Sequence, residues 1–289
     1  MGVRIFDSFI FLEYDSEVIM KNQLKKAFSF IKNKSKNKYS YDLLLHKVFA
    51  EKRSTHPNPL NKFSVFNGFS QSDEDGISLE ILRRIGLNSG FFVEFGVGDG
   101  TENNSLVLLA CNWKGVWFGG EELAFNSEIS NKLDFKKVWI TKDNIVSLYK
   151  SLGENADVIS LDLDGNDIYL VEKLLLNNIM PKLFIVEYNA KFPPQVEFKI
   201  DYNASHKWER DDYFGASLKS FNNLFTSYGY KLVCCSLSGA NAFFVSSDYA
   251  HLFDDVPKDI EEIYCEPFYF LRTKKMHPTS IRTILKLIS

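Results

Sequence analysis

The sequence predicts an α/β fold in which helices cover both faces of a doubly wound, mostly parallel sheet of seven strands. Three observations predict it. Short apolar segments without polar alternation recur from about residue 77, which is typical of parallel strands buried on both faces. Segments of helical periodicity separate them, as in repeated strand–helix units. The last two apolar segments are joined by only a few turn residues, and so short a connection requires antiparallel strands.

The expected elements follow one another at regular spacing. Strands are expected at 91–95, 115–118, 138–140, 158–161, 183–186, 230–236 and 242–247. Helices are expected at 78–85, 104–111, 167–176 and 216–228. Gly229 is expected to end the last of these helices, because glycine readily adopts the left-handed backbone conformation that terminates a helix. The final pair of strands then forms a C-terminal antiparallel hairpin.

By composition the chain divides into an N-terminal helical extension with a linker, an α/β core, and a C-terminal tail, at residues 1–75, 76–250 and 251–289. Within the extension, helical periodicity gives way to a lysine-rich loop, and a short helix is expected at 43–49. In the tail, Thr279 or Ser280 is positioned to cap a last short helix. The apolar face of that helix is expected to pack on the core, with membrane docking as the alternative.

Charge, hydropathy and cysteine spacing exclude several classes of protein. A formal net charge of −3 provides no general basis for binding nucleic acid. No run of about 18 apolar residues is present, so no transmembrane segment is expected. The first residues are too acidic for a signal peptide. The four cysteines lack the C-x-x-C spacing of metal sites, which predicts reduced thiols in a cytoplasmic protein.

The strand expected at 91–95 runs into a glycine-rich loop, FFVEFGVGDGTENN. Open α/β sheets bind ligands at the carboxyl ends of their strands, and glycines allow a ligand to approach the backbone closely. The spacing Gly96-x-Gly98-x-Gly100 departs from the G-x-G-x-x-G fingerprint of dinucleotide sites. Glu94 would repel a pyrophosphate. The loop therefore favours a cofactor with a cationic end.

This motif resembles the first motif of class I S-adenosylmethionine-dependent methyltransferases, an acidic residue followed by G-x-G-x-G. The resemblance implies that Glu94 lies near the methionine ammonium of that cofactor. The other residues expected to contact it in and after the loop are Gly96, Val97, Gly98, Gly100 and Asn104. Glu121, about 20 residues further on, suits the ribose hydroxyls. The resemblance also implies adenine contacts by Asp143 and Asn144, although either could simply cap a helix.

Carboxylates follow two of the expected strands. Asp162 and Asp164 come after the strand at 158–161, and Glu187 and Asn189 follow the next strand. Charge at the end of a buried strand is costly unless it is paired or bound, so these side chains are expected to converge where a substrate sits. Asp162 is also expected to contact the cofactor.

The same stretch is similar to the FkbM-type branch of the methyltransferases, which carries a D-x-[DE]-G-x-[DE] pattern. Here the pattern is Asp162-Leu-Asp164-Gly165-Asn-Asp167, and Asn166 or Asp167 could cap the following helix. Earlier in the chain, FSQSDEDGIS could bring Gln71 and Asp73 to the cofactor. The alternative is that this segment caps the helix expected from Ser78.

Transfer of a sulfonium methyl group to a hydroxyl requires positioning and removal of the acceptor proton. The hydroxyl has a high pKa, so a carboxylate base or a divalent ion is needed. Hard oxygen ligands suited to Mg²⁺ are offered by Asp162, Asp164, Glu187 and Asn189. The alternative base is His206, in a long loop over 190–214. That loop also carries aromatic rings suited to the apolar faces of a sugar, namely Tyr202, Trp208 and Tyr213.

The resemblance thus implies an O-methyltransferase that uses S-adenosylmethionine, with or without Mg²⁺. Its acceptor would be a saccharide or another small polar hydroxyl compound, within surface-glycan biosynthesis. An NAD-type oxidoreductase is the second hypothesis, and Glu94 and the glycine spacing disfavour it. The third is a non-catalytic protein of the same fold that binds a partner through its N-terminal extension.

Overall fold

The computed structural model describes residues 43–127, 130–269 and 279–289. The chain divides into two compact units, residues 1–50 and 51–289. Residues 43–50 of the first unit are helical, as expected. The helix and lysine-rich loop expected before residue 43 lie outside the described residues. Among the described helices, none combines the length and the apolar character needed to span a bilayer.

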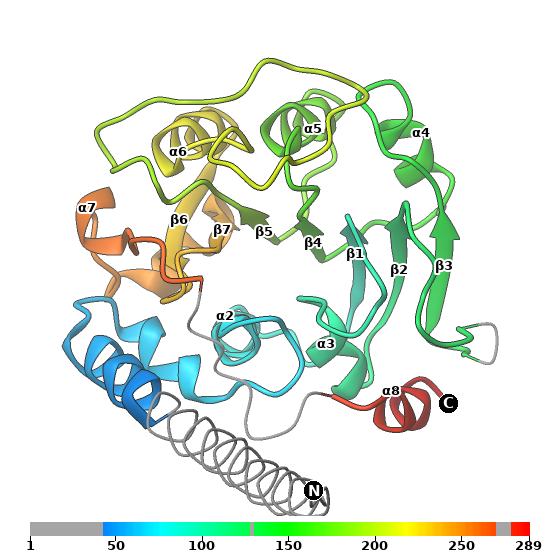
Figure 1. Ribbon diagram of the computed structural model, residues 1–289, viewed down its shortest axis with the longest axis horizontal. Coiled ribbons are helices and arrows are strands. Elements are labelled where there is room, and N and C mark those ends of the chain that lie inside the picture. The colour runs from blue at the N-terminus through cyan, green and yellow to red at the C-terminus, as the bar shows by residue number, and fades with distance from the viewer. Residues whose placement is uncertain (1–42, 128–129, 270–278) are drawn as a thin grey trace, which may run out of the picture. The chain divides into compact units, whose positions relative to one another are not determined.

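The second unit is built on a seven-stranded sheet of order β3-β2-β1-β4-β5-β7-β6 (Figure 1). Its strands are β1 Phe91–Phe95, β2 Lys114–Gly119, β3 Leu133–Lys137, β4 Val158–Leu161, β5 Leu183–Glu187, β6 Tyr230–Cys235 and β7 Asn241–Ser246. The first five pair in parallel, whereas β7 runs antiparallel to both β5 and β6. This arrangement confirms the predicted mostly parallel sheet with a C-terminal hairpin.

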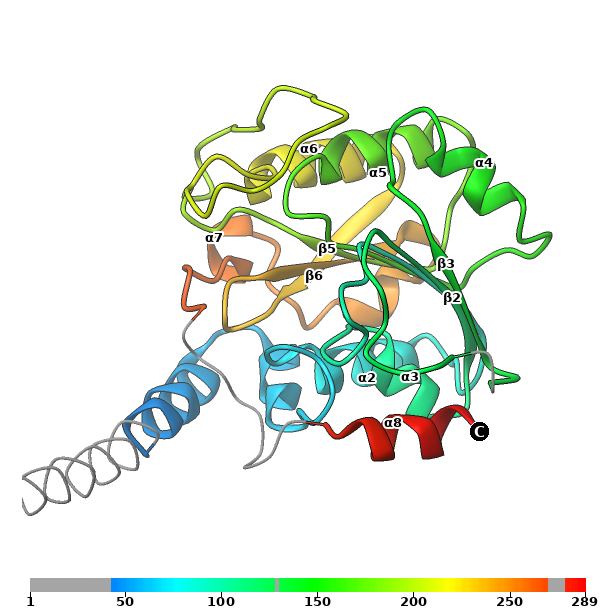
Figure 2. The same ribbon diagram turned by 45° about the vertical axis from the view of Figure 1, so that its right-hand side comes forward.

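Helices cover both faces of the sheet (Figure 2). One face carries α4 Ile145–Lys150, α5 Asp167–Leu175 and α6 Leu218–Ser227, and the other carries α2 Glu74–Arg84, α3 Leu106–Ala110 and α8 Ile281–Ile288. The shorter elements are η1 Pro59–Val65, η2 Ser247–Phe253 and α7 Ile260–Ile263. Every residue of β4 is buried between the two helical layers, which explains why its sequence shows no polar alternation.

The predicted position of the third strand is wrong. An apolar run suggested a strand at 138–140, but β3 is the preceding segment LDFKK. This strand lies at the edge of the sheet, where only one neighbour pairs with it and charged side chains remain in water. The apolar run that misled the prediction includes Trp139, which is 51% exposed.

Parts of the predicted extension and tail pack on the sheet domain. Asn58 Nδ2 donates to Val233 O at 2.8 Å, and Asn61 Nδ2 donates to the carbonyl of Cys235 at 2.8 Å. In the tail, Tyr188 Oη donates to Cys265 O at 2.7 Å. The division of the chain therefore falls after residue 50, and residues 51–75 belong to the same unit as the sheet.

The last helix, α8, begins where the sequence predicts. Ser280 accepts a hydrogen bond from Thr283 N and so caps it. Ile284 and Ile288 are fully buried, and Ser130 Oγ donates to Ile288 O at 2.8 Å. The apolar face of α8 thus packs on the sheet domain, as expected.

Candidate functional site

A cavity of about 400 Å³ lies over the glycine loop that follows β1. Its lining includes Glu94, Gly98 and Asn104, three of the predicted cofactor residues. The cavity opens at the carboxyl end of a central strand, as expected for a ligand site in an open α/β sheet.

A second cavity of about 760 Å³ lies over the ends of β4 and β5, and Asp162, Asp164 and Glu187 line it. Three residues line both cavities, namely Gln71, Gly96 and Asp162. The two cavities therefore adjoin, and Asp162 stands at the boundary between them. Two ligands bound side by side would meet at this residue.

The three glycines of the loop differ in what requires them. Gly96 has φ +97°, and a Cβ there would lie 1.6 Å from Asp162 O, so the fold itself demands glycine. Gly100 has φ +83°, and its Cβ would lie 2.9 Å from a Leu123 side-chain carbon. Around Gly98, by contrast, a Cβ would meet nothing within 4 Å. Gly98 is thus the glycine that borders open space in the cavity.

Glu94 is buried at the end of β1 and ties the far end of the loop to the sheet. Its Oε1 accepts from Asn104 N at 3.0 Å, and its Oε2 accepts from Ser105 N at 3.0 Å and from the Ser105 hydroxyl. Burial raises the pKa of Glu94, and these hydrogen bonds oppose that shift. The Asn103 side chain forms a further hydrogen bond with this carboxylate, so the loop occupies the roughly four acceptor positions of Glu94. Glu94 therefore acts on the cavity that it lines through its charge.

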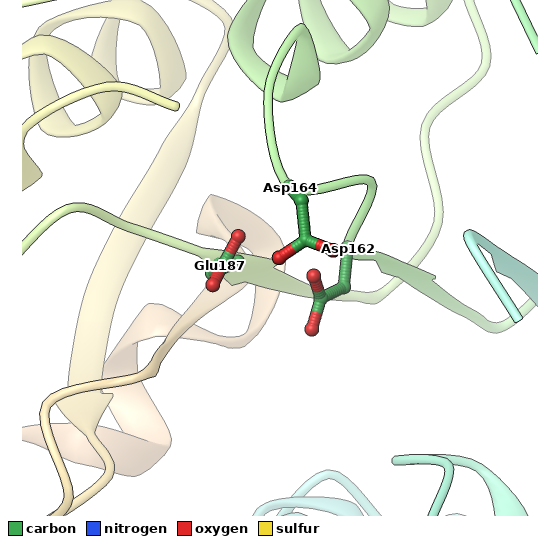
Figure 3. Close-up of side chains that lie close together, drawn as sticks. All are labelled: Asp162, Asp164 and Glu187. Atoms are coloured by element: carbon green, nitrogen blue, oxygen red, sulfur yellow. The ribbon is translucent and has the colours of Figure 1, made fainter. Parts of the chain in front are cut away.

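Asp162, Asp164 and Glu187 each place an oxygen within 4.8 Å of the other two (Figure 3). Burial, followed by repulsion from neighbouring carboxylates, raises the pKa of Asp162 and of Glu187 well above the ordinary range. Glu187 Oε2 is buried and finds no hydrogen-bond partner in the described part of the chain. Such crowding is relieved by a shared proton or by a bound cation.

The turn that carries two of these carboxylates is held in an uncommon conformation. Asp164 has φ +53°, a region that non-glycine residues rarely adopt and that clusters at functional sites. Asp167 supports the turn from the start of α5, because its two oxygens accept from Leu163 N at 2.8 Å and Gly165 N at 2.9 Å. Asp167 therefore holds the turn that precedes α5 and does not cap the helix, and Asn166, the residue at the N-cap, makes no side-chain capping hydrogen bond either.

Asn189 anchors the long loop after β5. Its Nδ2 donates to Asp212 O at 2.9 Å and to Phe214 O at 3.0 Å, and its Oδ1 accepts from Lys191 N at 3.2 Å. All the polar atoms of this buried side chain contact loop backbone. These contacts favour a positioning role for Asn189 over the predicted one as a metal ligand.

The predicted aromatic residues lie in three different places. Trp208 lines the larger cavity, and its Nε1 donates to the carbonyl of Asp211 at 2.7 Å. Tyr202 lies over the segment before α4, where its hydroxyl accepts from Lys142 N at 3.0 Å. Tyr213 lines a separate loop cavity of about 380 Å³. Trp208 is thus the predicted aromatic residue that the fold brings to the carboxylates.

His206 lies against the turn between β4 and α5. A Cβ on Gly165 would lie 2.3 Å from His206 Cδ2, so glycine at this position makes room for the ring. Nε2 of His206 is buried and lacks a hydrogen-bond partner among the described residues. His206 is near enough to oppose the burial-driven rise in the pKa of Asp164, but it lines the loop cavity rather than the larger one.

The predicted ribose and adenine residues lie near the surface. Glu121 is exposed beyond β2. Asn144 holds the segment before α4, since its Oδ1 accepts from Thr141 N and its Nδ2 donates to Trp139 O, both at 2.8 Å. The described lining of the cavity over the glycine loop includes neither of these residues, nor the exposed Asp143. Their roles in cofactor binding stay predictions.

Three consecutive acidic residues, Asp73, Glu74 and Asp75, are buried around the start of α2. This helix begins at Glu74 rather than at the predicted Ser78. Asp73 accepts from Leu237 N at 2.8 Å and Ser238 N at 3.2 Å, so it holds the β6–β7 turn, and the described lining of the cavity over the glycine loop does not include it. The backbone contacts of all three explain how such acidic residues are tolerated in the interior.

Asn241 is a residue of the candidate site that the sequence did not predict. It begins β7 and lines the cavity over the glycine loop. Its Nδ2 donates to Glu74 Oε1 at 3.1 Å, and its Oδ1 lies 3.5 Å from Asn104 Nδ2. In the sequence it belongs to the hairpin turn LSGAN, whose composition is explained by turn formation alone.

Two buried acids should make the stability of the protein fall as the pH rises. Burial raises the pKa of Glu74 to about 7 and that of Asp167 to about 6, so the folded state keeps protons that the unfolded chain has already released. Their stabilising effect is complete below about pH 4 and is lost as the pH rises through these values. We expect the free energy of unfolding, measured by urea denaturation, to fall by on the order of 3 kcal/mol between pH 5 and pH 8. Asp167→Asn should show a shallower loss, and a stability that increased over this range would contradict the assignment.

No protein-family model and no curated protein sequence matches the chain. The chain does resemble several solved structures. One is an O-methyltransferase family 2 protein from Planctomyces limnophilus in complex with apigenin, at 14% identity and a TM-score of 0.34, with 54% of this chain and 51% of that chain covered. Another is MycE methyltransferase from the mycinamycin biosynthetic pathway in complex with Mg, SAH and mycinamycin VI, at 13% identity and a TM-score of 0.36, with 57% and 47% covered. The chain spans about half the length of these proteins, and similarity at this level says nothing about its substrate.

Proposed function

We propose that the protein is an S-adenosylmethionine-dependent O-methyltransferase of the FkbM-like branch, acting on a saccharide or another small polar hydroxyl compound. The observation that carries the proposal is the pair of adjoining cavities with Asp162 at their boundary. A methyl donor in one cavity and a hydroxyl acceptor in the other would place their reacting atoms at this boundary, as in-line transfer requires.

The charge of the smaller cavity favours a sulfonium cofactor over NAD. Its described lining contains no lysine, arginine or histidine but four carboxylates, from Glu94, Asp99, Glu102 and Asp162. S-adenosylmethionine carries a sulfonium and an ammonium group, which carboxylates attract, whereas they would repel the pyrophosphate of NAD.

The carboxylates at the ends of β4 and β5 supply the base. A carboxylate with a raised pKa accepts a proton more readily than an ordinary one, so Asp162 or Glu187 is suited to take the acceptor proton as the methyl group is transferred. Trp208, on the wall of the same cavity, offers an aromatic surface for the apolar face of a sugar ring. A saccharide acceptor would in turn agree with a role in surface-glycan biosynthesis.

The same residues fit a divalent cation. Three carboxylates with oxygens within 4.8 Å of one another form a hard donor set of the kind Mg²⁺ binds, and one buried oxygen of Glu187 has no hydrogen-bond partner in the described part of the chain. Asp162, Asp164 and Glu187 would hold the ion. When bound, it would offset their repulsion and lower the pKa of the acceptor hydroxyl.

Isothermal titration calorimetry with S-adenosylhomocysteine and with NAD tests the proposal. We expect S-adenosylhomocysteine to bind and NAD to show no measurable heat. Glu94→Ala should weaken the binding of S-adenosylhomocysteine, because the cavity loses a carboxylate that attracts the ammonium group of the ligand. A wild-type protein that binds NAD but not S-adenosylhomocysteine would be an oxidoreductase candidate, and one that binds neither would be a non-catalytic candidate.

Mg²⁺ should raise the melting temperature, and by more at pH 8 than at pH 6. The reason is that the ligands must lose their protons before they bind the ion, and burial and repulsion hold the pKa of both Asp162 and Glu187 high. Differential scanning fluorimetry with and without Mg²⁺ measures the shift, and Asp164→Asn should reduce it. An unchanged melting temperature at both pH values, together with unchanged methyl transfer after exhaustive chelation, would exclude the metal.

A further inference from the structure

We infer that Gln71 binds the carboxylate of the cofactor's methionine end and so fixes the sulfonium at the boundary between the two cavities. This inference rests on the proposed function, since it takes S-adenosylmethionine as the ligand. The residue precedes α2, far in sequence from the glycine loop.

Gln71 is one of three described residues that line both cavities. It lines the cavity over the glycine loop and the larger cavity over the carboxylates, together with Gly96 and Asp162. Its side chain is exposed, and no described residue forms a hydrogen bond with its amide. The amide is therefore available to a ligand at the point where the two cavities meet.

The methionine end of the cofactor carries a carboxylate as well as an ammonium group, and this anion is the harder group to place. The described lining of the cavity contains four carboxylates and no cationic side chain. A ligand carboxylate must therefore find neutral hydrogen-bond donors, because it would otherwise lose its hydration without compensation.

Most neutral side-chain donors of that lining are already engaged within the protein. Thr101 Oγ1 donates to Asp99 Oδ1 at 2.6 Å, and the Asn103 side chain forms a hydrogen bond with Glu94. Asn104 Nδ2 donates to Ser160 Oγ at 3.2 Å, and Asn241 Nδ2 donates to Glu74 Oε1 at 3.1 Å. Gln71 is the side-chain amide of this lining for which the described residues provide no hydrogen-bond partner.

The fold also holds Gln71 in place from both sides. Ser70 N donates to Asp75 Oδ1 at 3.0 Å, and Ser72 N donates to Glu74 Oε2 at 3.1 Å. Both of these carboxylates are buried. The backbone on either side of Gln71 is thus fixed before a ligand arrives, which lowers the entropic cost of binding through its side chain.

The experiment compares two ligands on two variants. S-adenosylhomocysteine carries the amino-acid carboxylate, whereas 5′-methylthioadenosine has the same nucleoside and sulfur but lacks it. We expect Gln71→Ala to lower the affinity for S-adenosylhomocysteine about tenfold or more, as the loss of a hydrogen bond to a charged group would. The affinity for 5′-methylthioadenosine should be unchanged. Gln71→Glu should lower the affinity for S-adenosylhomocysteine further, because the new carboxylate would repel the carboxylate of the ligand. Both affinities are measured by calorimetry.

Gln195→Ala is the matched control, because Gln195 is an exposed glutamine that lines neither cavity. It should bind both ligands as the wild type does. If Gln71→Ala lost the same factor of affinity for both ligands, the residue would only shape the cavity, and the inference would be overturned. Unchanged S-adenosylhomocysteine binding in both Gln71 variants would overturn it while leaving the proposed function intact. A wild-type protein that fails to bind S-adenosylhomocysteine would overturn both.

Discussion

Asp162→Asn should reduce methyl transfer by about a thousandfold and at the same time stabilise the protein at pH 8. The loss of activity follows because the residue stands between the two cavities, where it serves as a base or as a ligand of a cation. The gain in stability follows because the substitution removes one of three mutually repelling carboxylates. We expect the free energy of unfolding to rise by about 1 kcal/mol, as for other strained functional sites. Urea denaturation and a radiolabelled methyl-transfer assay measure the two effects.

Asp254→Asn provides the control for this substitution. Asp254 is an exposed aspartate that lines neither cavity, so both its activity and its stability should match those of the wild type. The opposite signs of the two effects distinguish the site from a structural role. If Asp162→Asn were inactive and also less stable, the carboxylate would be a structural anchor and the proposed role would be wrong.

Gly98→Val should lower the affinity for S-adenosylhomocysteine by about a hundredfold without lowering the melting temperature of the protein. A Cβ at this position meets no atom of the described residues within 4 Å, so the fold accommodates a side chain there. The added methyl groups would extend into the open space over the glycine loop and occupy room that the cofactor needs. Calorimetry and scanning fluorimetry on the same preparation measure the two quantities.

Gly96→Ala is the contrasting variant from the same loop. Its Cβ would lie 1.6 Å from Asp162 O, in a backbone conformation that disfavours any side chain, so it should unfold the protein or lower its melting temperature strongly. The pair separates a glycine required by the ligand from one required by the fold. Normal binding by Gly98→Val would show that the cofactor lies elsewhere.

Most of the fold follows from local sequence pattern. The strand at 158–161 coincides with β4, because a strand buried on both faces must be apolar at every position. The edge strand β3 does not follow, since one of its sides faces water and its sequence LDFKK lacks that signal. The start of α2 was missed for a related reason. Three acidic residues suggest a solvent-exposed segment, and their burial depends on loop amides supplied from residues 68–72 and 237–238.

Within the site, residues next to a strand end were the predictable ones. The convergence of Asp162, Asp164 and Glu187 follows from the chain alone, because parallel neighbours present their carboxyl ends at one edge of the sheet. The side chains of the long loop were not predictable in the same way. Asn189 has the chemistry of a ligand, yet the loop backbone engages all its polar atoms, and nothing in local sequence distinguishes these two uses.

By itself, the sequence determined the α/β class, the antiparallel ending, the glycine loop and the carboxylates at two strand ends. Each of these depends on the period of a strand or helix, or on the conformational freedom of one residue type, and both are local properties. Only the tertiary structure decided that two cavities adjoin at Asp162, that Gln71 and Asn241 line the cavity over the glycine loop, and that Gly98 rather than Gly96 borders open space. These features arise where segments distant in the chain pack together, and the packing sets which polar groups are engaged within the protein and which remain for a ligand.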